Sequence, residues 1–214
     1  PIEGALKCLS KLHSVDTQKL TVNHNITNNI NSLKSICNIN SPAFTLYNAM
    51  NSSPFKTAVL DALHNTDPIH TDEYHCLIHC DFRWDNLLGA RGGTIIDWGD
   101  YCTGPRAYDL AYFLATSLAS LPPSQLPLNL DRWLLAALTH YEAAASDLGD
   151  ARSGQARSSA ADLVAAMTHW LPLAAWTPLT LLAKTDLSVS GRTYWRAVLA
   201  ASHPLFDVLV NLRN

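Results

Sequence analysis

Apolar residues recur at helical spacing near the start of the chain and again from residue 54. In the segment 4–16 four of them lie three residues apart: Leu6, Leu9, Leu12 and Val15. This spacing predicts an amphipathic helix with one apolar stripe. The segment 54–64 places its own apolar residues on one helical face in the same way, so we expect a second helix there.

Between residues 74 and 97 the pattern changes to short apolar runs. These runs cover residues 76–78, 87–88 and 94–96, and runs of this length are typical of strands. The last two runs flank the glycine-rich segment 89–93. We therefore expect them to pair as one small β-hairpin.

The rest of the chain reads as helix and loop. Pro105 precedes a segment whose apolar residues line one helical side. Residues 163–183 carry no formal charge and are long enough to cross a membrane, but Pro172 and Pro178 interrupt them. Since proline breaks the backbone hydrogen bonding that a span needs, we expect two buried helices that meet near these prolines. The predicted fold class is α+β, mostly α.

The charge composition disfavours some classes of binding partner. The 214 residues hold 15 Lys and Arg against 18 Asp and Glu, a net charge of −3. Because no basic patch is present, nucleic acid and membrane surfaces are disfavoured as partners. The length fits one domain over 1–214. Within it, the asparagine-rich segment 23–51 has weak helix propensity, and we expect a surface insertion there.

Five cysteines are an odd number in a chain large enough to form a core without disulfides. They favour reduced thiols and hence a cytoplasmic protein.

Two polar motifs stand on either side of the predicted hairpin. The first is His79-Cys80-Asp81-Phe82-Arg83-Trp84-Asp85-Asn86, and the second is Ile95-Ile96-Asp97-Trp98-Gly99-Asp100. The two motifs contain a carboxylate, an amide and a second carboxylate, in this order along the chain. The two motifs together are far more specific than either alone.

The paired motifs resemble the catalytic loop and the metal-binding element of the aminoglycoside phosphotransferase and choline-kinase-like family. The segments 104–114 and 9–16 are also similar to stretches of that family. The resemblance implies the large, C-terminal lobe of a protein-kinase-like fold. It also implies a kinase that transfers the γ-phosphate of ATP, with Mg²⁺, to a hydroxyl of a small molecule.

On this resemblance, Asp81 is the catalytic base that accepts the hydroxyl proton. Asn86 and Asp97 bind Mg²⁺ and, through it, the nucleotide. His79 and Asp109 support the loop structurally.

Two features depart from the family pattern. Cys80 stands where that family usually has glycine, and the run His75-Cys76-x-x-His79-Cys80 that it completes has metal-ligand types. A zinc site is disfavoured because neighbouring residues of a strand point to opposite faces and no second ligand pair follows. The glycine-rich loop, strand lysine and helix glutamate of a small lobe are also missing from this sequence. We therefore expect an N-terminal lobe to pack on this one, and the fragment alone to be inactive.

Two other functions remain to be weighed. A non-catalytic remnant or binding module would keep the fold without magnesium-dependent nucleotide binding. A protein kinase is disfavoured by the Asp-Trp-Gly sequence at residues 97–99 and by the absence of an Ala-Pro-Glu element after it.

Overall fold

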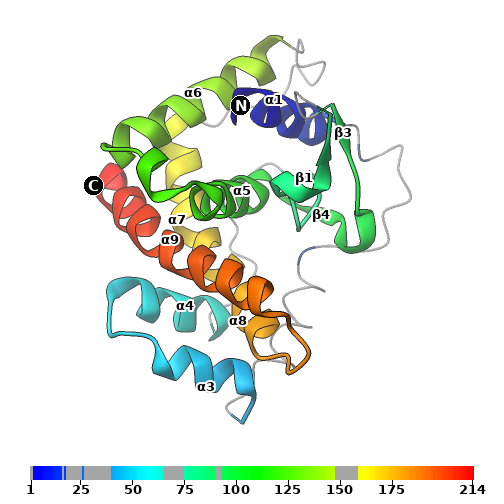
Figure 1. Cartoon of the computed structure of the whole chain (residues 1–214). Helices are drawn as coiled ribbons and strands as arrows, with labels where there is room; N and C mark the ends of the chain where they lie inside the picture. The colour runs from blue at the N-terminus through cyan, green and yellow to red at the C-terminus, as the bar shows by residue number, and fades with distance from the viewer. Residues whose placement is uncertain are drawn as a thin grey trace.

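The chain folds mainly into helices, with short strands gathered on one side (Figure 1). The computed structural model describes residues 2–15, 17, 26, 40–64, 75–89, 93–147 and 159–214. The helices are α1 (Ile2–His13), α3 (Pro42–Ala49), α4 (Pro54–His64), α5 (Arg106–Ser120), α6 (Leu130–Asp147), α7 (Ala160–Ala174), α8 (Trp176–Leu182) and α9 (Val189–Arg213). The strands are β1 (His75–Ile78), β2 (Leu87–Leu88), β3 (Thr94–Ile95) and β4 (Cys102–Pro105).

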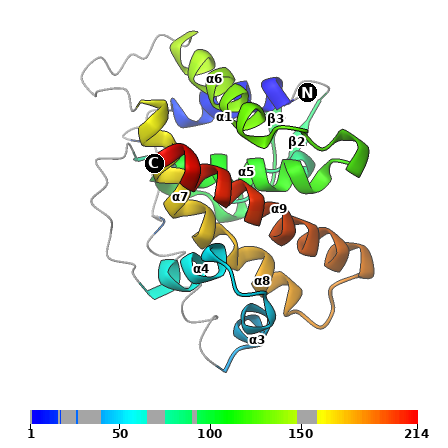
Figure 2. The ribbon, with the colours of Figure 1, turned by 90° about the vertical axis from the view of Figure 1, so that its left-hand side faces the viewer.

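Helix α5 is the centre of the molecule. It packs against α7 and α9 and also contacts β1, and it lies near the middle of the ribbon in both views (Figures 1 and 2). All residues from Ala107 to Leu118 are buried. A helix that is buried around its circumference needs protein on every side, and α7 and α9 supply much of this cover for α5.

The uncharged segment 163–183 forms two buried helices, as the prolines predict. Helices α7 and α8 are separated by Ala175 alone, and Pro172 lies within the last turn of α7. In the part of the chain that the structure describes, no helix is long and apolar enough to span a membrane.

The strands form two separate two-stranded antiparallel sheets. The predicted hairpin is confirmed as β2 and β3, with Leu87 opposite Ile95. The second sheet was not expected: β4 pairs with β1, with Ile78 opposite Cys102. Its Gly104-Pro105 sequence suggests a turn, yet the strand pairs with β1 along its whole length.

The first helix matches its prediction apart from its end. Leu6, Leu9 and Leu12 are buried, whereas Val15 is 36% exposed because α1 ends at His13. Helix α1 packs along α6 in both views (Figures 1 and 2).

The asparagine-rich segment is described only in part. Its residues 42–49 form α3, where the Tyr47 ring stacks on Trp176 of α8 with 5.6 Å between ring centroids. Ile26 is also buried. Residues 23–25 and 27–39 lie outside the described residues, so the surface insertion stays a prediction.

The predicted mostly helical α+β class is therefore confirmed. Its assignment as the large lobe of a kinase-like protein is a prediction that this arrangement leaves open.

Gly104 provides a test of the packing under β4. A Cβ atom added there would lie 2.6 Å from Ile78 Cδ1 and 3.0 Å from Ile26 Cβ. Because such contacts force a shift in a packed core, we expect Gly104→Ala to lower the free energy of unfolding by about 1–3 kcal/mol. Urea unfolding followed by circular dichroism measures this change. The matched control is Gly93→Ala, whose added Cβ meets nothing within 4 Å; equal stability of the two variants would contradict the packing account.

Candidate functional site

The loop that follows β1, residues 79–86, is held against α5 by aromatic packing. Phe82 is fully buried, and its ring lies 5.2 Å from that of Phe113. The Trp84 ring lies 5.4 Å from the same Phe113 ring, and the 3-10 turn η2 (Trp84–Asn86) ends the loop. The packing of Phe82 and Trp84 therefore fixes the path of the loop. The polar residues Asp81, Arg83 and Asp85 alternate with them along the chain.

The carboxylate of Asp109, in the first turn of α5, binds the backbone at the start of this loop. Its Oδ2 accepts the His79 N–H at 2.7 Å, and its Oδ1 accepts the Cys80 N–H at 2.8 Å. Asp109 is fully buried. Since an ionised carboxylate is costly to bury without donors, these two N–H groups both stabilise the charge and fix the loop in one position.

The same carboxylate links the loop to α1 and α6. His13 Nε2 lies 3.4 Å from Asp109 Oδ2, and His13 Nδ1 lies 2.7 Å from the Tyr141 hydroxyl. Burial lowers the pKa of His13 from its ordinary value, with Asp109 opposing the shift. A neutral ring fits this geometry, in which Nε2–H donates to Asp109 and Nδ1 accepts the Tyr141 hydroxyl proton.

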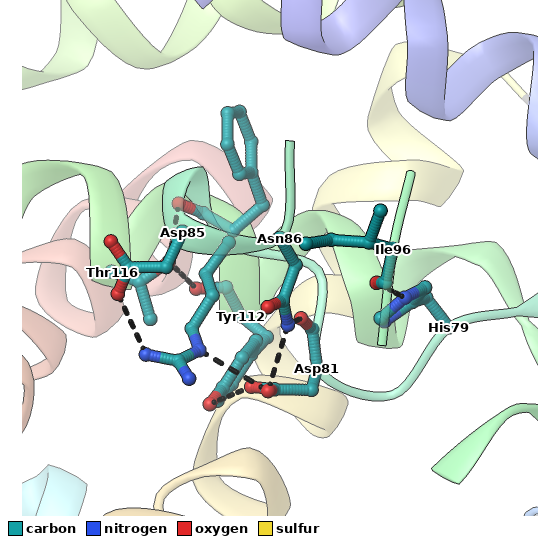
Figure 3. A network of polar contacts seen from close by, with 9 residues as sticks. His79, Asp81, Asp85, Asn86, Ile96, Tyr112 and Thr116 are labelled. Atoms are coloured by element: carbon teal, nitrogen blue, oxygen red, sulfur yellow. Dashed lines mark hydrogen bonds and ion pairs between the residues drawn. The ribbon is translucent and has the colours of Figure 1, made fainter. Parts of the chain in front are cut away.

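Asp81, the predicted catalytic base, has donors on both carboxylate oxygens (Figure 3). Its Oδ2 accepts from Asn86 Nδ2 at 2.9 Å and from Arg83 Nε at 3.1 Å. Its Oδ1 accepts the Tyr112 hydroxyl at 2.8 Å. The side chain is 23% exposed. Asp81 is therefore both fixed in orientation and reachable from solvent.

Asn86 lies directly against Asp81. Its Nδ2 donates to the Asp81 backbone oxygen at 2.8 Å as well as to the carboxylate. Only the amide nitrogen can serve two oxygen acceptors, so this pair of bonds fixes the amide orientation. Among the described residues no donor reaches Asn86 Oδ1, which leaves this oxygen able to accept a ligand.

Asp97 stands at the other end of the hairpin and makes no hydrogen bond with Asp81 or Asn86. The Ile96 N–H donates to the Asn86 backbone oxygen at 3.0 Å, which places Asp97 one residue beyond that bond. Asp97 has a left-handed backbone with φ of 62° and an exposed side chain. With the described residues its carboxylate makes no hydrogen bond or ion pair. The structure thus joins Asp81 to Asn86 and leaves Asp97 nearby through the hairpin backbone.

His79 connects the loop to the hairpin through its side chain. Its Nε2 donates to the Ile96 backbone oxygen at 2.9 Å, and the Trp98 ring lies 4.8 Å from its own. Its Nδ1 is buried and has no hydrogen-bond partner among the described residues. This placement holds the residue before Asp97 in position.

A pocket of about 1010 Å³ opens beside Asp81. The loop contributes Asp81, Arg83 and Asp85 to its wall, and Asp100 also lines it. The opposite wall comes from α8, the start of α9 and the segment that connects them. Neither Asn86 nor Asp97 lines this pocket, so Asp81 stands between the pocket on one side and the hairpin on the other.

Two residues of the site were missed from the sequence. Tyr112 lies three positions after Asp109 on α5, a spacing that places both on one helical face. Burial and the Asp81 charge raise the pKa of Tyr112 well above its usual range, so its hydroxyl keeps its proton and donates.

Arg83 binds Asp81 and also Asp85 Oδ2 at 2.9 Å, while its guanidinium lies 5.5 Å from the centre of the Trp195 ring. Burial opposes its charged form, but the neighbouring Asp81 carboxylate raises the pKa of Arg83 overall. The guanidinium therefore stays charged beside Asp81.

The metal-ligand types that the sequence places around Cys80 form no cluster in the described part of the chain. There, no three His, Cys, Asp or Glu side chains are close enough to hold a metal ion together. The side chain of His75 lies outside the described set. Magnesium, in contrast, needs only one or two protein ligands when phosphate and water supply the others.

This chain is similar to known phosphotransferases in its sequence pattern and in its fold. The sequence model of the phosphotransferase enzyme family matches residues 2–146. A crystal structure from Ralstonia eutropha JMP134, of a protein named as a candidate aminoglycoside phosphotransferase, superposes with a TM-score of 0.61 at 13% identity. The superposition covers 98% of this chain and 64% of that one, so this chain spans less than two thirds of its length. No curated protein sequence matches significantly.

The Asp109 anchor generates a stability prediction. In Asp109→Asn one carboxylate oxygen becomes an NH₂ group, so at least one of the two loop N–H groups loses its acceptor. We expect the free energy of unfolding to fall by about 2 kcal/mol. Chemical unfolding of both proteins tests this, with the exposed Asp186→Asn as a control that should change it by less than about 0.5 kcal/mol. A variant as stable as the parent would show that the carboxylate does not hold the loop.

Proposed function

Since this chain belongs to the phosphotransferase enzyme family, whose sequence model matches residues 2–146, we propose that it transfers the γ-phosphate of ATP to a hydroxyl group of a small molecule. Asp81 is the base, and Asn86 with Asp97 holds Mg²⁺. The observation that carries this proposal is the Asp81 carboxylate, oriented by three donors at the wall of a pocket large enough for a small molecule.

The two oxygens of Asp81 differ in a way that supports its role as the base. Oδ2 has two donors, one of them a charged guanidinium, which occupy its two lone-pair directions. Oδ1 has one neutral donor, Tyr112, and keeps a lone pair. We therefore assign proton acceptance to Oδ1. As the acceptor hydroxyl attacks phosphorus, its proton passes to Oδ1, and ADP leaves.

The oxygens near the hairpin suit Mg²⁺. Asn86 Oδ1 has no donor among the described residues, and the exposed Asp97 carboxylate has no partner there. Amide and carboxylate oxygens are ligands that Mg²⁺ accepts while it keeps water or phosphate in its other positions. When bound, the ion would neutralise charge on the phosphates. Asn86 thus has two roles, since its nitrogen orients Asp81 while its oxygen is available to the metal.

Phosphate positioning also requires a glycine-rich loop and a strand lysine, and these residues contain neither in the family's pattern. We accordingly propose that the 214-residue chain alone has little phosphotransferase activity. Activity assays therefore use the longest natural form of the protein. A stop codon immediately upstream of Pro1, or no magnesium-dependent nucleotide binding by that longest form, would favour a non-catalytic remnant or binding module instead.

Substitution of the base tests the assignment. Asp81→Asn removes the proton acceptor but keeps the size of the side chain, so we expect turnover to fall at least about a hundredfold. A coupled assay of ADP release over a panel of small hydroxyl compounds measures it. Asp131→Asn, at the exposed start of α6, is the control and should keep parental turnover. Near-normal turnover of Asp81→Asn would remove Asp81 from the mechanism.

Tyr112 is proposed as a positioning residue that acts through Asp81. Tyr112→Phe deletes one hydroxyl from a buried ring, and loss of one hydrogen bond to a carboxylate predicts a roughly tenfold lower kcat. The KM for ATP should not change, because the ring lies on the α5 side of Asp81. Steady-state kinetics separates the two constants. Tyr101→Phe, whose ring is 41% exposed, serves as the matched control; an unchanged kcat in Tyr112→Phe contradicts the positioning role.

A further inference from the structure

A thiol of the loop that contains Asp81 lies against a thiol of β4. Cys80 Sγ lies 3.3 Å from Cys102 Sγ. Cys102 is fully buried on β4, and Cys80 is 8% exposed. The two residues are 22 positions apart in the sequence, so the fold brings them together.

The backbone geometry explains why they meet. Ile78 is opposite Cys102 in the pairing of β1 with β4, and Cys80 follows two residues later. Cys80 has a left-handed backbone with φ of 67°, a conformation that costs a residue with a side chain about 1–2 kcal/mol relative to the right-handed form. Glycine would fit this turn without strain. This chain instead has a thiol there, directed at a second thiol.

We propose that Cys80 and Cys102 form an oxidation site, a dithiol that a hydroperoxide converts to a disulfide. The thiolate of Cys80 attacks a peroxide oxygen, which yields a sulfenic acid and one water (or alcohol) once protonated. Cys102 then attacks the sulfenic sulfur and expels a second water. Two thiols lose two protons and two electrons, the peroxide bond is reduced, and a thiol reductant reverses the change.

The order of attack follows from access. Cys80 lines the same pocket as Asp81, so a small oxidant reaches it from there. Cys102, with no exposed surface, is the resolving thiol.

Disulfide formation should lower the phosphotransferase activity. This one consequence rests on the proposed function. A disulfide brings its sulfurs to about 2.05 Å, so Cys80 must move towards β4. Asp81 is the next residue in the chain. Since a displacement of about 1 Å in a catalytic group can cost a hundredfold in rate, we expect oxidation to inactivate the enzyme.

Mass spectrometry tests the site on the 214-residue chain whether or not that chain is active. After treatment with hydrogen peroxide we expect tryptic peptides 57–83 and 92–106 to be joined, with a mass about 2 Da below their sum. Fragmentation should place the bond at Cys80, and dithiothreitol should reverse it. Two control variants should keep the bond. Cys76→Ala removes the other cysteine of peptide 57–83, and Cys8→Ala removes a cysteine of α1.

Two variants should lose the bond. Cys102→Ala removes the resolving thiol, and Cys80→Gly removes the first thiol while fitting the left-handed backbone, so failure to fold does not explain its result. The absence of a link in the parent chain, a link through Cys8, Cys37 or Cys76, or a sulfinic acid on Cys80 without a link would overturn the proposal.

Activity assays on the longest natural form keep this inference separate from the proposed function. A loss of turnover of at least tenfold on oxidation, restored by dithiothreitol and absent from Cys102→Ala, supports both. If the link forms while the parent and Asp81→Asn are equally inactive, the phosphotransferase assignment fails and the dithiol stands. If the link forms and turnover is retained, inactivation by oxidation is wrong.

Discussion

The buried carboxylate of Asp109 is the interaction on which the rest of the site depends. It accepts two consecutive backbone N–H groups at the start of the loop and contacts His13 from α1. A buried charge is stable only where donors surround it, so the residues that satisfy Asp109 cannot move independently of it. Through His13 and Tyr141 the same requirement ties α1 and α6 to the loop.

Asp81 directly follows Cys80, whose N–H is bound by Asp109. Asp97 directly follows Ile96, whose N–H donates to the Asn86 backbone oxygen. Asn86 connects the two parts: its side chain binds Asp81, and its backbone oxygen binds Ile96. The carboxylate of Asp81 is thereby given two unlike oxygens, one saturated and one open. In the proposed reaction this orientation costs nothing at the moment of proton transfer, because folding has already supplied it.

Sequence patterns predicted the elements whose stability is local. The helix over 54–64 and the strands beside the glycine-rich segment 89–93 follow from periodicity and composition, and both are present. Strand β4 was missed because its Gly104-Pro105 sequence favours a turn, and only pairing with β1 makes it a strand. The motif located Asp81 and Asn86 but not Tyr112, whose role depends on how α5 is rotated against the loop. No sequence pattern could show that Cys80 and Cys102 touch, since that contact depends on the register of two strands.

The pocket beside Asp81 has walls of different kinds. One wall belongs to the loop, within the residues that match the family, and the other comes from α8 and α9, which lie after residue 146. In the proposed reaction, the residue that accepts the proton and the helices across the pocket from it are therefore encoded in separate stretches of the gene. On that proposal, substitutions among the pocket-lining residues of α8 and α9 change which acceptor fits the pocket, while the sequence of the loop that contains Asp81 stays the same.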